Sequence, residues 1–404
     1  MLKADKSDCD VLIIGCGITG LAIANELVRA NFENIIIIDK ENHAGAHASG
    51  RNSGVLHSGV YYSPGSLKAR FCVEGNKLMR EYCEENGLTI KNTGKVIVAT
   101  DEKRLENLYE LKRRAKHAGA TANIIDEKEL REIEPNAYTL QKALYCPDTS
   151  VVKPGEILSH LIDKLTATGK VKIKFGTSFI GLSAENKVKT SDGEIEYKKI
   201  INAAGAYAEK IAQCFGLGRE YNLIPFKGTY KKLKKESSEL VKGNIYPVPD
   251  LNNPFLGVHF TKSVDGTVFA GPTAIPALSR ENYNLFENLD GETLEILFRD
   301  GLLTLLSGSF RSAAVNEIKK YFDHYFYHEA KTLVPNLKPG DLVSSGKVGI
   351  RPQLVHWPEK KLVMDFIVLK EGDSVHVLNA ISPGFTTSMA FSRHVVDMLE
   401  GKND

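Results

Sequence analysis

The first forty positions alternate between apolar runs and a glycine-rich segment. Positions 11–14 (VLII) and 35–38 (IIII) are uninterrupted apolar runs, typical of strands buried on both faces of a sheet. Positions 21–30, which lie between them, read as a helix. We therefore predict a strand–helix–strand unit at the start of the chain.

Two later segments carry a related pattern. Positions 198–212 (KKIINAAGAYAEKIA) predict a strand, a turn of small residues and a helix. Positions 375–399 predict a strand, a turn and a helix that begins near Thr386 or Thr387. Strands followed by helices favour an α/β class for this part of the chain.

Glycines fill the turn between the first strand and the first helix. Gly15, Gly17 and Gly20 have the GxGxxG spacing, and Asp39 follows the second strand about twenty residues later. Gly15 permits the tight turn, Gly17 lets the backbone approach a pyrophosphate, and Gly20 lets the helix pack against the strand. The helix N-terminus attracts phosphate, and Asp39 can accept hydrogen bonds from a ribose. The complete pattern predicts a dinucleotide site, whereas the glycines alone would fit any tight turn.

The dinucleotide is NAD or FAD, and four features favour FAD. The irregular stretch 43–66 follows the second strand where an NAD domain continues with regular βαβ units. The small residues in 198–212 allow a second backbone approach to the ligand. The segment 346–354 (GKVGIRPQL) holds a cation in a turn framed by Gly and Pro. The helix after 375–378 would present its N-terminus to the negative charge of a reduced flavin.

Composition limits the remaining classes of protein. The 404 residues predict two domains, and a net charge of +2 gives no reason to expect a nucleic-acid partner. The six cysteines form no CxxC pair and no metal-ligand spacing, so we expect free thiols, a reducing compartment and no metal site. The first residues show no signal-peptide pattern, and no apolar run approaches ~20 residues. We expect a cytoplasmic protein without a transmembrane span.

The stretch 49–71 (SGRNSGVLHSGVYYSPGSLKARF) is unusual for a loop. It contains four glycines, five serines, a histidine and two adjacent tyrosines, and it lacks a period until its end. So many hydrogen-bonding and aromatic groups in one loop indicate contact with a ligand, although a structural loop with a buried histidine would also explain them.

These segments resemble a known family. The chain is similar to FAD-dependent oxidoreductases of the D-amino-acid-oxidase-like class, and more narrowly to L-2-hydroxyglutarate dehydrogenases/oxidases. The motifs that carry the resemblance are NSGVLHSGVYYSPGSLKARFCVEGN, PFKGTY, IYPVPDLNNPFLGVHFT, GIRPQ and VLNAISP. The chain departs from the family at Arg51, where His is common, at Pro352, where Ala is common, and in 382–392 (SPGFTTSMAFS).

The resemblance implies a Rossmann-like FAD-binding domain interleaved with an α+β substrate domain built on an antiparallel sheet. The expected boundaries are 1–90, 150–221 and 345–404 for the FAD domain, and 91–149 and 222–344 for the substrate domain. The sequence agrees with this layout, because 91–100 reads as a strand outside the first unit and a charged helix follows it near 101–118.

The resemblance also implies that the loop 49–62 lies beside the flavin, with His57 and Tyr61 on the substrate side. The expected FAD-binding residues are Gly15, Gly17, Ile18, Thr19, Gly20, Asp39, Lys40, Ser49, Arg51, Asn52, Ser53, Gly54, Val55, Ala204, Gly205, Arg351, Pro383, Gly384, Phe385, Thr386 and Thr387. For His57 we favour a role as a base, because an imidazole titrates near neutrality.

The implied reaction is oxidation of a 2-hydroxy acid to the 2-oxo acid by hydride transfer to flavin N5, with L-2-hydroxyglutarate as the best candidate. An Arg fork holds a carboxylate well, and Arg351 is our candidate for the α-carboxylate. Lys227 is the leading candidate for the second carboxylate of such a substrate, followed by Tyr230, Tyr246 and His259. For Tyr246 and His259, an ordinary core position is an equal alternative.

Three functions stay open at this point. Besides a 2-hydroxy-acid dehydrogenase or oxidase, the chain fits a related flavoenzyme for an amino acid, an imino acid or glycerol 3-phosphate, and it fits a flavin subunit of an electron-transfer complex. The electron acceptor is a quinone, an electron-transfer protein or oxygen. Positions 294–310 are apolar on more than one face, which fits peripheral contact with the inner face of the cell membrane. For these positions we favour a buried helix of the substrate domain.

Overall fold

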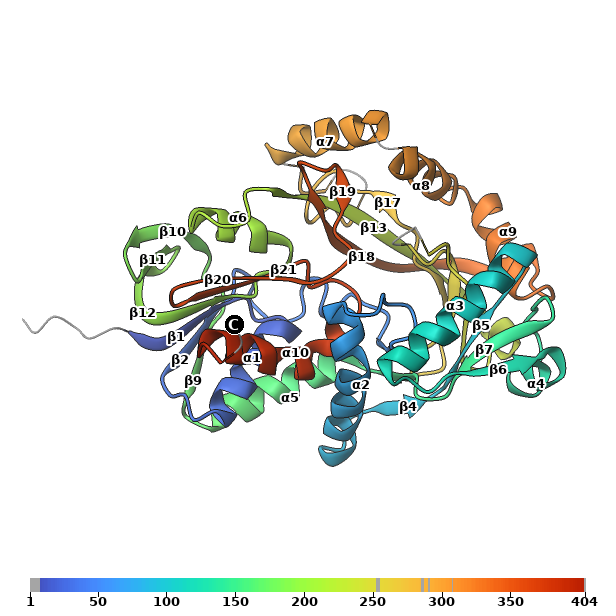
Figure 1. Cartoon of the computed structure of the whole chain (residues 1–404), viewed down its shortest axis with the longest axis horizontal. Helices are drawn as coiled ribbons and strands as arrows, with labels where there is room; N and C mark the ends of the chain where they lie inside the picture. Colours follow the sequence, from blue (N-terminus) through green and yellow to red (C-terminus); the bar gives the residue numbers. More distant parts are fainter. Residues whose placement is uncertain (1–7, 252–254, 285–286, 290, 307, 403–404) are drawn as a thin grey trace, which may run out of the picture.

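The computed structural model describes residues 8–251, 255–284, 287–289, 291–306 and 308–402, so part of the motif 245–261 lies outside the described residues. Two large sheets lie beside each other (Figure 1). The chain crosses between them several times, which confirms the predicted class of a Rossmann-like unit interleaved with a second, mostly antiparallel unit. The exact domain boundaries stay a prediction.

The first sheet contains the predicted strand–helix–strand unit. Its parallel strands lie in the order β21 (Ser374–Leu378), β12 (Gly193–Asn202), β1 (Cys9–Ile14), β2 (Ile35–Ile38) and β9 (Val171–Lys174). The antiparallel strands β20 (Ile367–Glu371), β10 (Phe179–Ala184) and β11 (Lys187–Thr190) extend it. Every residue of β2 is buried, as its continuous apolar run predicts.

Helices cover both faces of this sheet (Figure 1). One face carries α1 (Ile18–Arg29), α5 (Pro154–Ala167), α10 (Gly384–Leu399) and α2 (Leu67–Glu85), and the other carries α6 (Ala208–Cys214). The last helix begins at Gly384, two residues before the earliest predicted start, with Pro383 as its N-cap. The earlier start brings Pro383 and Gly384 to the end of the helix that faces the ligand cavity.

The second sheet is mostly antiparallel. Its strands run in the order β19 (Lys361–Leu362), β18 (Leu342–His356), β13 (Tyr221–Leu233), β16 (Val268–Gly271), β15 (His259–Lys262), β14 (Asn244–Pro247), β5 (Lys95–Val98), β7 (Lys142–Cys146) and β6 (Asn123–Asp126), and β17 (Ile275–Pro276) pairs with β13. Among the described strands of this second sheet, only the β14–β5 pair is parallel. The helices of this part are α3 (Glu102–Ala118), α4 (Glu127–Ile133), α7 (Glu292–Leu306), α8 (Gly308–Lys319) and α9 (Asp323–Leu333). Three short 3-10 helices, at Gly205–Tyr207, Lys235–Leu240 and Pro339–Asp341, complete the helical elements.

The predicted strand 91–100 is divided between two sheets. Its start belongs to β4 (Ile90–Asn92) in a small sheet with β8 (Ser150–Val152) and β3 (Val55–Leu56), and its end is β5. Gly94, with φ +61°, lies between β4 and β5, where the chain changes direction. The charged helix predicted at 101–118 is confirmed as α3.

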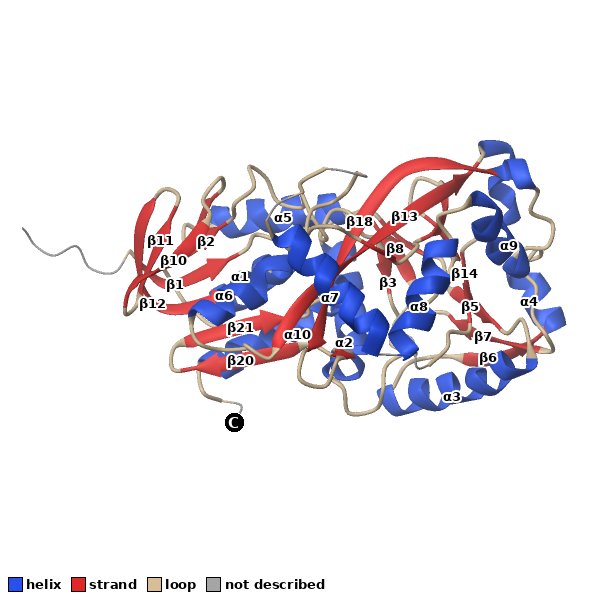
Figure 2. Ribbon diagram, turned by 90° about the horizontal axis from the view of Figure 1, so that it is seen from above, coloured by secondary structure: helices blue, strands red, loops and turns tan. Residues whose placement is uncertain are grey.

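The segment predicted as a buried helix at 294–310 is instead a surface element. It forms α7 and the start of α8, which lie along the outer surface above the long β13–β18 pair (Figures 1 and 2). Leu294, Phe298 and Leu305 are 75%, 68% and 76% exposed, whereas Ile296 and Leu303 are buried. The helix therefore packs by one face and leaves a second apolar face in solvent.

Candidate functional site

A cavity of about 740 Å³ is lined by residues of both sheets. Its lining comes from the ends of β1 and β2, the N-termini of α1 and α10, the loop 43–57, and the strands β13 and β18. This volume falls within the range of protein sites for small molecules and cofactors.

The glycine turn at the start of α1 is shaped for close approach. Gly15 has φ +107°, and a Cβ there would lie 2.5 Å from the carbonyl oxygen of Ala203. A Cβ on Gly20 would lie 1.9 Å from the carbonyl oxygen of Gly15, so only glycine lets α1 pack this closely on β1. Gly17 is the N-cap of α1, and the Ser49 hydroxyl accepts a hydrogen bond of 3.0 Å from the Ile18 N–H. The helix N-terminus faces the cavity, as a pyrophosphate requires.

Asp39 lies at the C-terminal end of β2 and lines the same cavity. Its two carboxylate oxygens accept hydrogen bonds from the N–H groups of Cys16, at 2.7 Å, and Glu41, at 2.9 Å. These bonds fix the carboxylate beside the glycine turn. Its remaining lone pairs can accept the hydroxyls of a ribose.

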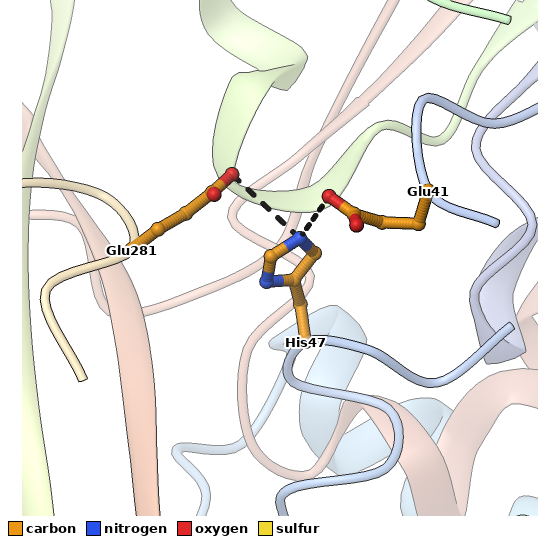
Figure 3. A group of neighbouring side chains, drawn as sticks. All are labelled: Glu41, His47 and Glu281. Carbon is orange, nitrogen blue, oxygen red and sulfur yellow. Dashed lines mark hydrogen bonds and ion pairs between the residues drawn. The ribbon is translucent and has the colours of Figure 1, made fainter. Parts of the chain in front are cut away.

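A charged group at the cavity wall joins the loop 43–51 to the segment 279–284. The His47 ring lies between the carboxylates of Glu41 and Glu281, with Nε2 2.9 Å and 3.6 Å from their oxygens (Figure 3). The Lys40 ammonium pairs with both carboxylates, 2.6 Å from Glu281, so a cation already occupies this acidic group. The group is therefore an ion-pair network, although its oxygens and nitrogen are close enough together to ligate a metal.

Two aromatic contacts strengthen the same junction. His47 Nδ1 lies 2.7 Å from the Tyr283 hydroxyl, and the Arg51 guanidinium lies 4.1 Å from the centre of the Tyr283 ring. We call the side chains of Lys40, Glu41, His47, Arg51, Glu281 and Tyr283 the clasp. All six line the cavity.

A buried arginine anchors the segment that carries one side of the clasp. Arg280 is 3% exposed, and its guanidinium pairs with Glu209 of α6 and with Glu292 of α7, at 2.7 Å for the second contact. It also donates to the carbonyl oxygen of Ala206. A fully paired buried guanidinium of this kind holds α6, α7 and the segment 279–284 in one arrangement.

The loop 49–57 runs along the cavity and leads to His57. The backbone of His57 is held on two sides, because its N–H donates to the Thr386 hydroxyl at 3.1 Å and its carbonyl oxygen accepts from the Asn76 amide at 3.1 Å. The ring lines the cavity, and its Nδ1 is buried without a hydrogen-bond partner among the described residues. Burial, with a smaller effect of Lys95 and His259, lowers the pKa of His57 to about 3. The imidazole is therefore neutral at physiological pH, whereas the sequence argument assumed titration near neutrality.

Arg351 projects into the cavity from β18. It lies opposite Phe226 of β13, and its Nη2 donates to the Gln353 side chain at 3.3 Å. Burial lowers the pKa of Arg351 to about 10, and the nearby Tyr62 partly offsets this effect, so the guanidinium stays charged at neutral pH. A charged guanidinium in a cavity wall can bind a carboxylate through two parallel hydrogen bonds.

The structure does not bring Lys227 to the cavity. Phe226, Gly228 and Tyr230 of β13 line it, and side chains alternate along a strand, so Lys227 faces the other side. Its ammonium donates to the carbonyl oxygen of Asn284 at 3.0 Å instead. This position argues against the predicted role of Lys227 as a substrate anchor.

Two other predicted substrate residues form one wall. The rings of Tyr246 and His259 are stacked, with their centres 3.9 Å apart, and both line the cavity. His259 Nδ1 lies 2.9 Å from the carbonyl oxygen of Gly257, which can only accept, so this nitrogen carries the proton and Nε2 is an acceptor. Burial lowers the pKa of His259 to about 4.

Most of the predicted residues meet at this cavity. Beside those described above, the lining includes Thr19, Asn52, Ser53, Val55, Ala204, Gly205, Phe385 and Thr386. Five predicted residues do not line it, namely Gly20, Gly54, Tyr61, Thr387 and Lys227. Gly20 and Gly54 instead allow close backbone packing, and the Thr387 hydroxyl bonds to the backbone of its own helix turn.

Sequence reasoning missed several lining residues. His47, Arg280, Glu281 and Tyr283 belong to polar stretches without a motif, and only the fold brings them together. Tyr207 was missed as well, although it lies directly after the small-residue turn at 203–205, which was the available signal.

Comparisons with known proteins agree with this geometry. The profile of the FAD dependent oxidoreductase family (DAO) matches residues 10–398. The chain is 34% identical to the human mitochondrial L-2-hydroxyglutarate dehydrogenase over 98% of this chain and 90% of that protein. It is 35% identical to the L-2-hydroxyglutarate dehydrogenase of Indibacter alkaliphilus over 96% of this chain and 98% of that protein.

Solved structures show the same fold. The FAD-bound L-alpha-glycerophosphate oxidase of Mycoplasma pneumoniae superposes with a TM-score of 0.75 at 23% identity, covering 97% of this chain and 94% of that one. The L-proline dehydrogenase of P. horikoshii superposes with a TM-score of 0.72 at 17% identity, covering 99% and 96%.

The cavity, the glycine turn and the matched profile define a flavoenzyme. The chain belongs to the DAO family of FAD-dependent oxidoreductases, which confirms the predicted cofactor and enzyme class. Within that family, its similarity is to the branch whose curated members are named L-2-hydroxyglutarate dehydrogenases.

The neutral state of His57 predicts a pH dependence of stability. Its pKa is about 3 in the folded protein and near 6.5 in the unfolded chain, so only the unfolded chain binds the proton between these values. His57 therefore stabilises the fold fully above pH 6.5, and this contribution falls by about 1.4 kcal/mol per pH unit below it. Urea unfolding of the FAD-loaded protein at about pH 7.5 and pH 5.5 measures the change.

The variant His57→Gln should reduce this loss of stability by about 1.4 kcal/mol across that interval. The variant His117→Gln, on the exposed surface of α3, is the matched control. An equal pH dependence in wild type and His57→Gln would contradict a neutral buried His57.

Proposed function

We propose that this enzyme oxidises a 2-hydroxy dicarboxylate, L-2-hydroxyglutarate, to the 2-oxo acid. The observation that carries the proposal is the charged Arg351 in the wall of a cavity that neutral, buried imidazoles also line. The names of the curated relatives, which match over almost the whole chain, support the same substrate. When bound, FAD supplies the two-electron acceptor for the hydroxyl-bearing carbon.

The residues of the chain then have separate roles. Arg351 holds the α-carboxylate and fixes the orientation of the α-carbon, since a guanidinium fork leaves little freedom of rotation. His57 is neutral and lines the cavity, so it can accept the hydroxyl proton. Tyr230, Tyr246 and His259 shape the wall around the substrate and exclude water.

An anaerobic mixing experiment tests the substrate. We expect L-2-hydroxyglutarate to bleach the visible absorbance of the bound flavin, and we expect its D-enantiomer not to, because Arg351 presents only one face of the α-carbon to the acceptor. Panels of 2-amino acids, imino acids and glycerol 3-phosphate cover the alternative substrates. Bleaching by glycerol 3-phosphate, with no response to any 2-hydroxy acid, would overturn the proposal.

The role of Arg351 is tested by two substitutions. Arg351→Ala removes a charged hydrogen bond of about 1.5–3 kcal/mol, so the concentration for half-maximal bleaching should rise about 10- to 100-fold. The maximal bleaching rate should fall as well, because the α-carbon loses its orientation. Arg351→Lys should restore only part of both values, since an ammonium lacks the fork. Equal kinetics in Arg351→Ala and wild type would exclude this role.

We also propose that the outer face of α7, α8 and α9 contacts a lipid surface. Ten of the fifteen large apolar side chains that are strongly exposed among the described residues lie between Leu289 and Tyr325. Exposed apolar residues scattered singly are normal, but a cluster of this kind marks an interaction surface. No helix of the described residues is long and apolar enough to cross a membrane, so the contact is peripheral.

The position of this surface favours a membrane-bound electron acceptor, a quinone, over oxygen. α8 contributes Glu317 to the cavity lining, so the apolar surface and the cavity share one wall. An acceptor dissolved in the lipid would therefore meet the enzyme on the side that adjoins the site.

Vesicle sedimentation tests the surface. The double variant Leu294→Gln/Phe298→Gln should bind at least about 10-fold less to phosphatidylglycerol-containing vesicles, because two apolar side chains lose a burial of roughly 1.5–3 kcal/mol each. FAD content should not change, since both side chains are exposed. The matched control is Leu182→Gln/Met364→Gln, two exposed apolar residues that lie outside the segment 289–325 and outside the cavity lining. Equal vesicle binding by the two double variants would contradict the proposed surface.

A further inference from the structure

Lys95 is a buried cation without a counter-charge. It lies in β5 and is 1% exposed, and its Nζ has no hydrogen-bond partner among the described residues. Arg280, also buried, shows the contrast, because two carboxylates pair with it. An unpaired buried ammonium is unfavourable, so a position of this kind calls for an explanation.

The surroundings of Lys95 are aromatic and neutral. Its Nζ lies 4.6 Å from the centre of the Tyr61 ring and 5.2 Å from that of the Tyr246 ring. The titratable groups that face it come from five other segments, and they are His57 and Tyr61 of the loop, Cys72 of α2, Cys146 of β7, Tyr246 of β14 and His259 of β15. Burial raises the pKa of both thiols, so neither thiol is an anion at neutral pH.

This surrounding disfavours the charged form of Lys95. Burial lowers the pKa of Lys95, and the neighbouring thiols offset only part of the effect. No carboxylate of the described residues forms an ion pair with it. The charged form of Lys95 therefore needs an anion from outside the chain to stabilise it.

The cavity that would hold this anion lies next to Lys95. Tyr246, His259 and His57 line the cavity, and Lys95 itself does not, so its ammonium lies one side chain behind the wall. Arg351, which the proposed function assigns to one carboxylate, lies on the β18 side of the same cavity. Lys227, the cation that the sequence favoured for the second carboxylate, faces away.

We propose that Lys95 is the second positive charge of the site and that it takes up a proton when a dicarboxylate enters the cavity. The proposal rests on the proposed function in taking the ligand to be a dicarboxylate and in assigning its other carboxylate to Arg351. One carboxylate is held by Arg351, and the other lies against the Tyr246–His259 wall within the field of Lys95. Lys95 is thus a positioning residue, which favours dicarboxylates over monocarboxylates without touching the reacting carbon.

Glutarate and butyrate are the probes, because neither has a hydroxyl to be oxidised and they differ by one carboxylate. Calorimetric titration of the FAD-loaded protein in buffers of different ionisation enthalpy gives both the affinity and the number of protons taken up. Between about pH 7 and about pH 9, where Arg351 stays charged, wild type should take up more protons with glutarate than with butyrate. His57 and His259, with pKa values of about 3 and 4, remain neutral over this range and do not contribute.

Lys95→Met keeps an unbranched side chain of nearly the same length and removes the charge. Glutarate should bind roughly 10-fold more weakly to this variant and without proton uptake, as expected for one charge several ångströms away in a protein interior. Butyrate affinity and FAD content should be unchanged, which also shows that the variant folds. If Lys95→Met does not fold, Lys95→Arg gives the second test, because its permanent charge should bind glutarate without proton uptake.

Two lysines of the same sheet serve as controls. Lys262→Met removes a half-buried cation of β15 that bonds to the carbonyl oxygen of Val241, outside the cavity, and it should behave as wild type. Lys347→Met removes a half-buried cation of β18 that lies over Tyr230 and Phe269. Loss of proton uptake in Lys347→Met and not in Lys95→Met would overturn the proposal, and so would unchanged glutarate binding in Lys95→Met.

The outcome is separable from that of the proposed function. Proton uptake that depends on Lys95, in an enzyme whose flavin no 2-hydroxy acid bleaches, would refute the proposed reaction and leave this inference standing. Bleaching by L-2-hydroxyglutarate, together with glutarate binding that is the same in Lys95→Met and wild type, would support the proposed reaction and refute this inference.

Discussion

The antiparallel pairing of β13 with β18 is the constraint on which the site depends. It runs from Tyr221 opposite His356 to Leu233 opposite Leu342 and sets Arg351 across from Phe226. Because side chains alternate along a strand, this register decides which of them face the cavity. A shift of β18 by one residue would turn Arg351 away from the cavity, and a shift of β13 by one residue would instead turn Lys227 toward it.

The same pair fixes the loop that carries His57. A Cβ on Gly349 would lie 2.8 Å from the carbonyl oxygen of Arg51, and one on Gly228 would lie 2.9 Å from the ring of Pro272. Only glycine at both positions allows the sheet to lie against the loop and against the 272 turn. The substrate side and the flavin side of the cavity therefore share one pair of strands, which is long and bent across the molecule (Figure 2).

Local signals in the sequence were sufficient for the flavin side. The spacing of Gly15, Gly17 and Gly20 between buried strands predicted both the turn and its ligand. Each of these glycines is needed by backbone that lies only a few residues away in the sequence. The side on which Lys227 lies was not predictable in this way, because it depends on the register between strands more than a hundred residues apart. The sequence could not show that Lys95 lacks a counter-charge either, because its neighbours come from five other segments. The pKa of His57 also needed the fold, because desolvation depends on everything packed around the ring.

The clasp has a consequence for the lifetime of the bound cofactor. Its two sides come from different parts of the chain, the loop 39–51 and the segment 279–284, and both line the cavity. We expect FAD exchange to require these sides to separate, whereas turnover of a small acid should not. The lifetime of the complex is therefore set by half-buried ion pairs, which salt weakens, rather than by the affinity of the glycine turn alone. We therefore expect an enzyme of this design to keep its cofactor through many turnovers and to release it faster as ionic strength rises.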